Sequence, residues 1–425
     1  MGSDNAAGDR LRRRTTVLAG ARLAAGAGRT FYGSVEIAGE RVVQIVTAAQ
    51  PMHLTDWPAD GIDLSGYLVL PGLINAHDHL EFSLYPRLAD PPYRNYLEWG
   101  EDIHTKFANV IARQHSVPKE VRLWWGGIRN LLCGVTTVCH HNPFWPELQN
   151  PAFPIRVVSK YEWAHSVALG GDLRAARADP FESRPFIVHA CEGTDDFARY
   201  ELHRLDELGL LDENTVLVHG LSIGRDGAAL IEERRASLIV CPSSNHFLYG
   251  RFPHLEVLSS IQRTALGNDS PLTAKGDLLD EVRFAIDTCG ISPSHAYRMV
   301  TTLPASILQL ENGEGSLAKF GVADLIVVRD TSQTPAAQLR NLFAMDVELV
   351  MIGGRVQLAS NALRERLPLH ATHGLEPLTI GETVRWLRAP VRELLDAAEA
   401  ALGKDGVRLG GKKTAVPANE ARYAG

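Results

Sequence analysis

Apolar runs of strand length alternate with helix-length stretches through the middle of the chain. The runs cover residues 67–70, 135–138, 186–188, 216–218 and 238–240. Residues 121–133 and 196–208 lie between such runs and have the length of helices. Alternation of this kind indicates parallel βα units. We therefore predict an α/β fold with a (β/α)8 TIM-type barrel over residues 65–310.

The stretch between Val138 and Phe186 fits this alternation poorly. It contains one clear strand-like run, at residues 155–159. We therefore expect the barrel to be distorted there, or a loop to replace regular structure.

The two ends of the chain have a different pattern, with short strand-like runs broken by glycine. Residues 34–37 and 41–46 flank an Ala-Gly-Glu turn and predict a hairpin, and similar runs return at 323–328 and 347–356. We expect both ends to meet in a small β-sandwich domain made of residues 15–64 and 311–365. The alternative is two unrelated hairpins.

Residues 366–425 predict a helical C-terminal extension. Residues 381–388 predict a short helix, and a second helix is expected to begin at Pro390, run to about Leu402 and end at Gly403. The last residues are polar and predict a mobile tail.

Composition narrows the class of protein. The chain has 425 residues, of which 45% are hydrophobic and 22% are charged, as in ordinary globular proteins. The net charge of −7 gives no general attraction to nucleic acid or to anionic membranes. Five cysteines without a Cys-x-x-Cys pair favour reduced thiols in a cytoplasmic protein over a disulfide framework.

Targeting and membrane signals are weak. The basic run at residues 10–14 precedes an apolar stretch, but Arg22 interrupts that stretch after a few residues, which is short for a signal peptide. No run approaches the ~18 apolar residues of a membrane-spanning helix, so we expect no membrane association.

Two histidines end the segment at residues 71–79, which follows a Pro-Gly turn. His77 and His79 are spaced i, i+2, so on a strand both side chains project to one side, as two ligands of one metal ion do. The pair alone is a weak signal, because many such pairs are surface or core histidines.

Further polar residues stand at the ends of later strand-like runs. His189 and Glu192 follow one run, and His219 ends the next. Residues 241–245 and Asp269 follow two more. In a TIM-type barrel the catalytic groups come from the ends of several strands at one face, so this recurrence supports an active site.

The ordered set of motifs resembles the amidohydrolase superfamily, in the branch that contains cytosine deaminase and the triazine hydrolases. The resemblance covers roughly residues 15–360. Its pieces are residues 71–79, 134–138, 189–192, 218–220, 241–245, 267–270, 301–305, 315–317 and 323–325.

This resemblance implies one divalent metal ion held by His77, His79, His189 and Asp269. Histidine nitrogens with one carboxylate suit zinc or iron, and the sequence does not choose between them. A hydrolytic metal lowers the pKa of water toward neutrality. The resemblance further implies that His219 and Glu192 work beside the metal.

The residues of this chain are chemically suited to these roles. Asp269 can take the proton of the water. Glu192 can pass a proton to the substrate nitrogen or leaving group. His219 can steady the attacking oxygen or polarise the bond under attack.

Other residues near the strand ends remain open. Relatives with two metals use a carboxylated lysine at a strand end, and Lys160 follows the run at 155–159; the His-x-x-Glu pattern favours one metal and a solvent- or substrate-facing role for Lys160. His140, His141 and His165 either line the pocket or are structural. A last group could shape the pocket or meet an acidic substrate, though packing and surface roles are the alternative: Tyr93, Trp99, His104, Phe144, Trp145, Arg87, Arg94 and Arg251.

The function predicted from these observations is metal-dependent hydrolysis of a C–N bond in a small molecule, with deamination of a nitrogen heterocycle as the leading hypothesis. Hydrolysis of an amide or cyclic amide, or dechlorination, is the alternative on the same fold. A non-catalytic scaffold is the third hypothesis, and it gives no reason for an intact metal site. Similar proteins often form dimers or larger homo-oligomers, and the sequence does not decide the oligomeric state of this chain.

Overall fold

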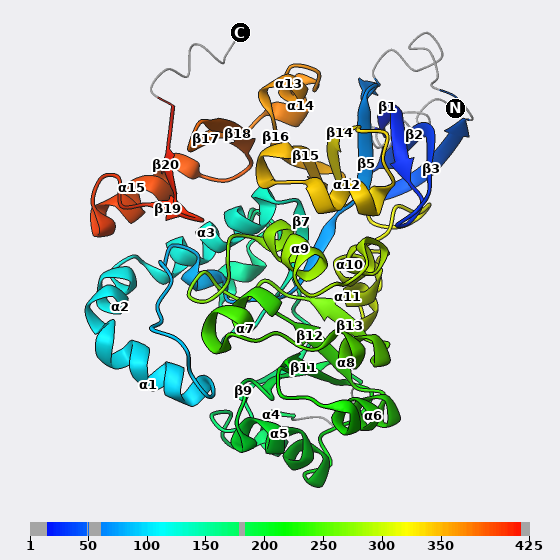
Figure 1. The fold of residues 1–425 in the computed structure, drawn as a ribbon. Helices are drawn as coiled ribbons and strands as arrows, with labels where there is room; N and C mark the ends of the chain where they lie inside the picture. Colours follow the sequence, from blue (N-terminus) through cyan, green and yellow to red (C-terminus); the bar gives the residue numbers. More distant parts are fainter. Residues whose placement is uncertain (1–14, 49, 51–60, 178–182, 418–425) are drawn as a thin grey trace, which may run out of the picture.

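The computed structural model describes residues 15–48, 50, 61–177 and 183–417 of the chain (Figure 1). The predictions made for residues 1–14, including the basic run, and for residues 418–425 of the polar tail lie outside the described residues.

Both ends of the chain contribute to one twelve-stranded sheet, drawn across the top of Figure 1. Its path runs β19-β20-β17-β18-β16-β15-β14-β5-β1-β2-β3, with β4 beside β1. The strands are β1 (Thr15–Ala24), β2 (Thr30–Ala38), β3 (Arg41–Ala48), β4 (Ile62–Asp63), β5 (Tyr67–Pro71), β14 (Leu325–Arg329), β15 (Val347–Ile352), β16 (Arg355–Ala359), β17 (Glu376–Ile380), β18 (Thr383–Leu387), β19 (Arg408–Leu409) and β20 (Lys412–Ala415).

The two chain ends meet where β5 pairs antiparallel with β14, with Leu70 opposite Ile326. The predicted hairpin is confirmed, since β2 pairs antiparallel with β3. Apolar side chains from both ends share one core, which includes Leu18, Leu325 and Leu349. Both chain ends thus contribute to one β-unit, as the sequence predicts. The domain boundaries themselves stay a prediction.

Parallel strands form the second unit of the fold. They are β6 (Leu73–Asp78), β7 (Val135–His140), β8 (Arg156–Val157), β9 (Glu162–Ser166), β10 (Phe186–Ala190), β11 (Thr215–His219), β12 (Ser237–Val240) and β13 (Thr264–Leu266). One sheet has the order β13-β12-β11-β10-β9 and another has the order β6-β7-β8. An isolated parallel bridge between Asp78 and Asp269 joins β6 to the end of β13. The predicted TIM-type barrel is therefore confirmed, with its strands in barrel order.

The barrel is open between β8 and β9. β8 pairs with β7 and β9 pairs with β10, but no ladder joins β8 to β9 in the part of the chain that the structure describes. Only residues 158–161 separate them, whereas adjacent parallel strands need a crossover of a dozen or more residues. One extended stretch thus lies where a regular barrel has two strands and a helix, which confirms the distortion expected in this region.

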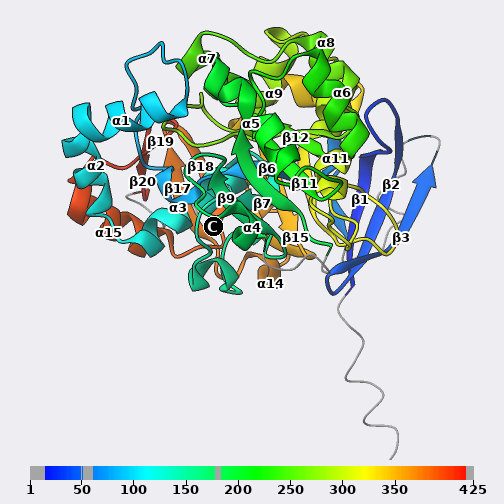
Figure 2. The same ribbon diagram turned by 90° about the horizontal axis from the view of Figure 1, so that it is seen from below.

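Helices surround these strands, and Figure 2 shows α1, α2, α6, α7 and α8 at the periphery of the strands. The helices that follow or flank the barrel strands are α1 (Tyr96–Lys106), α2 (Ala108–His115), α3 (Lys119–Leu132), α4 (Leu173–Ala176), α5 (Asp196–Glu207), α6 (Arg225–Arg234), α7 (Pro242–Tyr249), α8 (Leu255–Ser260), α9 (Leu278–Asp287), α10 (Pro293–Met299) and α11 (Thr302–Ile307). The helices outside the barrel are α12 (Pro335–Asn341), α13 (Asn361–Arg364), α14 (Leu369–Thr372) and α15 (Val391–Leu402). The predicted helices at 121–133 and 196–208 correspond to α3 and α5.

The C-terminal extension is only partly helical. Residues 381–388 do not form the predicted helix, because residues 383–387 are strand β18, which pairs with β17 across a two-residue turn. Gly381 in this turn has φ of +61°, a conformation that suits a tight hairpin and no helix. The second predicted helix is confirmed as α15, which Pro390 precedes and Gly403 follows.

No helix among the described residues is both long and apolar enough to cross a membrane. All five cysteines are free and buried.

Candidate active site

The predicted site residues lie at the carboxyl ends of four barrel strands. His77 is near the end of β6 and His79 directly follows it, while His189 lies in β10 and His219 ends β11. Asp269 follows β13, whose end is tied to β6 by the backbone N–H of Asp269, which donates to the carbonyl oxygen of His77 at 3.0 Å. The barrel therefore brings residues that are almost 200 positions apart in sequence to one face.

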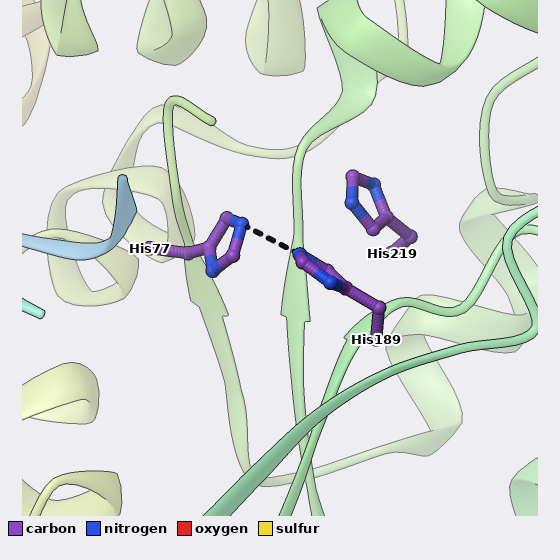
Figure 3. A group of neighbouring side chains, drawn as sticks. All are labelled: His77, His189 and His219. Atoms are coloured by element: carbon purple, nitrogen blue, oxygen red, sulfur yellow. Dashed lines mark hydrogen bonds between the residues drawn. The ribbon is translucent and has the colours of Figure 1, made fainter. Parts of the chain in front are cut away.

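The ligand atoms of these residues converge in two overlapping sets. Within the described residues, the atoms of His77, His189 and His219 lie within 4.8 Å of one another, and so do those of His77, His79 and Asp269. Figure 3 shows the three imidazole rings of the first set facing one another. The four predicted metal ligands are thus divided between the sets, with His77 common to both.

The separations within this cluster match the size of a divalent metal site. The Nε2 atoms of His77 and His189 are 3.1 Å apart. Oδ1 of Asp269 lies 3.8 Å from Nε2 of His77 and 3.6 Å from Nε2 of His79. A tetrahedral ion with bonds of about 2.0–2.1 Å holds its ligand atoms roughly 3.3–3.4 Å apart. The donor set therefore fits a metal ion in both chemistry and spacing.

Hydrogen bonds fix the tautomers of two of these histidines. Nδ1 of His189 donates to the carbonyl oxygen of His165 at 2.6 Å, and Nδ1 of His219 donates to Oδ1 of Asn245 at 3.0 Å. Each neutral ring then has its lone pair on Nε2, the atom that faces the cluster. Nδ1 of His77 and of His79 is buried with no hydrogen-bond partner among the residues described.

Burial keeps His77, His189 and His219 neutral. It lowers the pKa of His77 and His189 well below the usual value, and neighbouring histidines lower each pKa further. Burial also lowers the pKa of His219, although Asp269 opposes this. Metal ligands must be deprotonated, so a neutral cluster at neutral pH is suited to bind a cation.

Asp269 is held as a carboxylate. Burial by itself raises its pKa, but His219 and His79 together with two hydrogen bonds make the net pKa lower than usual. These bonds come from the hydroxyls of Ser244 at 2.7 Å and Thr273 at 2.8 Å, and both end on Oδ2. Oδ1 is left facing the histidines.

Glu192 has the opposite character. Burial and the nearby charge of Asp269 raise the pKa of Glu192 to about 8, and a hydrogen bond from Tyr249 opposes them. At neutral pH this carboxyl therefore carries a proton. Two carboxyl groups with pKa values shifted in opposite directions are suited to act as a base and an acid in one site.

The cluster is almost closed to solvent. The most exposed of its members, His79, is only 8% exposed, and Glu192 is 6% exposed. The segment that leads into α1 contacts the loop after β10 and the end of α7: Tyr96 N–H donates to the carbonyl oxygen of Glu192, and Tyr93 N–H donates to that of Leu248.

The remaining candidates have varied surroundings. His141 is buried in the cluster, with its ring stacked 4.2 Å from that of His189 and its Nε2 donating to the carbonyl oxygen of Ala164. His165 is exposed, and it contributes its carbonyl oxygen to the site rather than its ring. Lys160 is also exposed, which agrees with a solvated charge.

Packing or surface contacts account for several of the aromatic and basic candidates. Trp99 donates to the carbonyl oxygen of Leu88 and packs against a small hydrophobic core. Arg87 donates to the carbonyl oxygen of Ala274 and lies over the ring of Phe247. Arg94 pairs with Glu98 at the surface.

Sequence reasoning did not identify Thr273 and Tyr249 as partners of the site, and it included Ser244 only within the segment 241–245, without a role of its own. Ser244 and Tyr249 belong to α7, which begins directly after β12. Their position after a strand end is the signal that could have found them, since barrel sites are built from such segments.

Known proteins are similar to this chain in sequence. A sequence profile of the amidohydrolase family matches residues 183–357. The 5-methylthioadenosine/S-adenosylhomocysteine deaminase of Pyrococcus furiosus is 25% identical over 348 residues, which are 63% of this chain and 78% of that protein.

Solved structures share the fold. A mutant atrazine chlorohydrolase from Arthrobacter aurescens TC1, complexed with zinc and atraton, superposes with a TM-score of 0.67 at 16% identity over 91% of this chain and 99% of that chain. An adenosine deaminase from Xanthomonas campestris with bound zinc has a TM-score of 0.62 at 18% identity, over 91% of this chain and 97% of that chain.

Proposed function

Because this chain belongs to the amidohydrolase superfamily, we propose that it is a metal-dependent hydrolase that deaminates a nitrogen heterocycle. The observation that carries the proposal is the cluster itself. Histidine Nε2 atoms and one carboxylate oxygen face the same small space, and a protonated carboxyl, Glu192, lies beside them.

His77, His79, His189 and Asp269 would hold one divalent ion, either zinc or iron. The spacing of their ligand atoms and the mixture of imidazole and carboxylate support this. When bound, such an ion acts as a Lewis acid and makes hydroxide available near neutral pH.

The protein residues handle the protons of the reaction. Hydrolytic deamination adds the elements of water to a C–NH2 carbon and releases ammonia, so one proton leaves the water and the departing nitrogen gains one. Oδ1 of Asp269, the carboxylate oxygen that Ser244 and Thr273 leave without a hydrogen bond, accepts the first proton. Glu192 carries its proton at neutral pH and delivers it to the substrate nitrogen or to the leaving group.

His219 is placed to orient the attack. Its Nε2 lies 3.6 Å from Oε2 of Glu192, and Asn245 holds the ring from the other side. It steadies the developing charge on the attacking oxygen or polarises the bond under attack once Nε2 has gained a proton, because the neutral ring has its lone pair on that atom.

The named relatives support an exocyclic amine as the group that leaves. One is a deaminase of 5-methylthioadenosine and S-adenosylhomocysteine, and one structural neighbour is an adenosine deaminase. A second candidate function is dechlorination, favoured by the fold shared with an atrazine chlorohydrolase. Hydrolysis of an amide or cyclic amide stays a further alternative. A cytoplasmic location and a homo-oligomeric assembly are part of the proposal.

The test begins with elemental analysis of the purified protein, followed by release assays. About one zinc or iron per chain and ammonia release from an aminated purine, pyrimidine or triazine are expected. Chloride release alone would move the assignment to dechlorination. Full turnover after complete removal of metal would refute the metal-dependent mechanism, and a metal-free, inactive protein after reconstitution would favour a scaffold.

A further inference from the structure

The two oxygens of Glu192 have different surroundings. Oε1 accepts a hydrogen bond from the hydroxyl of Tyr249 at 2.9 Å. Oε2 lies 3.6 Å from Nε2 of His219. Both Glu192 and Tyr249 are buried, with exposures of 6% and 5%. Water therefore does not exchange freely with either oxygen.

The direction of the Tyr249 hydrogen bond follows from its surroundings. Oε1 of Glu192 is the one acceptor that the described residues place within hydrogen-bonding distance of this hydroxyl. If the hydroxyl accepted a proton from Glu192 instead, its own O–H would be buried without a partner, at a penalty of about 1–3 kcal/mol. Burial and the neighbouring Glu192 also raise the pKa of Tyr249 well above its ordinary value, so the hydroxyl keeps its proton. Tyr249 is therefore the donor.

A donor at Oε1 decides where the proton of Glu192 resides. A protonated carboxyl has one hydroxyl oxygen and one carbonyl oxygen, and the carbonyl oxygen is the better acceptor. With Tyr249 donating to Oε1, the acidic proton belongs on Oε2. That oxygen is the one turned toward His219 and the cluster.

The position of Tyr249 is itself fixed by the protein. It is the last residue of α7, and the backbone N–H of Tyr93 donates to the carbonyl oxygen of the preceding Leu248 at 2.9 Å. At the other end of α7, Glu281 accepts a hydrogen bond from the backbone N–H of Ser243 at 2.7 Å. The helix is thus held at both ends.

The same helix touches two other members of the site. Ser244 donates to Oδ2 of Asp269, and Asn245 accepts from Nδ1 of His219. In each of the three contacts, a residue of α7 forms a hydrogen bond with the side-chain atom that faces away from the cluster. The second polar atom of that side chain is left facing the cluster. The hydrogen bond from Tyr249 to Glu192 is therefore of the same kind as those that α7 forms with Asp269 and His219.

We propose that Tyr249 is a positioning residue that reserves Oε1 of Glu192 as an acceptor and so presents the transferable proton on Oε2. This inference rests on the role of Glu192 in the proposed function. It goes beyond that function by assigning the proton to one oxygen and by making the leaving-group step depend on a residue that touches no substrate.

The Tyr249→Phe variant removes the hydroxyl and keeps the ring. We expect its metal content and melting temperature to match those of the wild type, with KM unchanged and kcat for ammonia release reduced by roughly 10- to 100-fold, a part of the usual contribution of a positioned acid. A chloro analogue of the same substrate is the discriminating probe. Chloride leaves without a proton, so kcat for chloride release is expected to fall by less than about threefold.

The matched control is Tyr67→Phe. The hydroxyl of Tyr67 is also buried, but it has no hydrogen-bond partner among the described residues and lies in the large sheet. We expect this variant to keep both activities. Equal losses for amine and chloride in Tyr249→Phe would show that the proton does not go to the leaving group and would overturn the dependence of the leaving-group step on Tyr249. No loss in either would overturn the whole inference.

A crystal structure of Tyr249→Phe separates this inference from the proposed function. We expect Glu192 to adopt a new rotamer, or a water molecule to occupy the place of the lost hydroxyl. If the wild type releases no ammonia, the proposed function fails, while a displaced Glu192 still supports the positioning role. An unchanged Glu192 with no water at Oε1 overturns the positioning role even if the wild type is an active deaminase.

Discussion

Nη2 of Arg129 lies 2.6 Å from Oδ1 and 2.7 Å from Oδ2 of Asp78, and both side chains are buried. Asp78 stands between His77 and His79, and its side chain also accepts a hydrogen bond from Asn130 at 2.7 Å. The pair therefore fixes, from behind the cluster, the piece of backbone that presents two of the proposed metal ligands. Supporting contacts of this kind orient ligands and tune metal affinity.

Arg129→Met is expected to lower the free energy of unfolding by about 3–5 kcal/mol, because it leaves the carboxylate of Asp78 buried without its counter-charge. We expect metal affinity to fall about 10- to 100-fold as well. Urea denaturation and metal titration measure the two effects. Arg94→Met is the control, since the side chain of Arg94 is 75% exposed in its pair with Glu98, and its change should stay within about 0.5 kcal/mol. A similar small change at Arg129 would contradict the role given to the pair.

Removal of the metal is expected to lower the melting temperature as well as to abolish turnover. An ion that binds only the folded protein stabilises it by mass action, so the chelated protein should unfold earlier and recover on reloading. Lower pH should weaken metal binding, because the cluster histidines must stay neutral to act as ligands. Calorimetry with and without chelator checks this, and an unchanged melting temperature on complete metal loss would argue against a site built from these buried residues.

The site was largely predictable because its residues repeat one local rule. His77, His189, His219 and Asp269 each follow or end an apolar strand, and strand ends meet at one face of a barrel. The fold class follows from the same alternation. These features depend on residues that are close in sequence, so the pattern along the chain reveals them.

The features that were missed depend on tertiary contacts. Tyr249 meets Glu192 only because the loop after β10 and the end of α7 converge. Strand β18 has a pattern that also suits a short helix, and its pairing with β17 decided the outcome. The single stretch from β8 to β9 replaces two strands, and residues 155–159 gave no sign that their continuation pairs with β10.

Glu192→Gln is expected to stay folded and metal-loaded and to lose at least about 100-fold in kcat, since a positioned general acid contributes 10²–10⁴. In the wild type, burial raises the pKa of Glu192 to about 8. The proton is therefore present below this pH and lost above it, so kcat/KM should decline above pH 8. A pH–rate profile checks the decline. Retention of full activity by a folded, metal-loaded Gln variant is the outcome that refutes the role of Glu192.

Glu281 supplies a prediction about stability and pH. Burial raises the pKa of Glu281 to about 8, although two hydrogen bonds with Ser243 oppose the shift. The unfolded chain loses this proton near the ordinary glutamate pKa of 4.5, whereas the folded protein keeps it to about 8. Between these values the folded state binds more protons, so the contribution of Glu281 to the unfolding free energy is fully present below pH 4.5 and falls as pH rises to 8. Each pKa unit corresponds to about 1.4 kcal/mol, so the total loss is on the order of a few kcal/mol.

Glu281→Gln is therefore expected to flatten the decline in stability between pH 4.5 and 8 and to leave the variant more stable than the wild type above pH 8. The neutral amide accepts from the backbone N–H of Ser243 and donates to its hydroxyl, so it imitates the protonated acid and keeps α7 anchored. Urea denaturation across this pH range measures the effect. Glu98→Gln is the control, because the pKa of this exposed carboxyl is lowered by Arg94 and it titrates below the window. If Glu281→Gln keeps the slope of the wild type, then the ionised Glu281 is stabilised in the folded protein by groups other than Ser243.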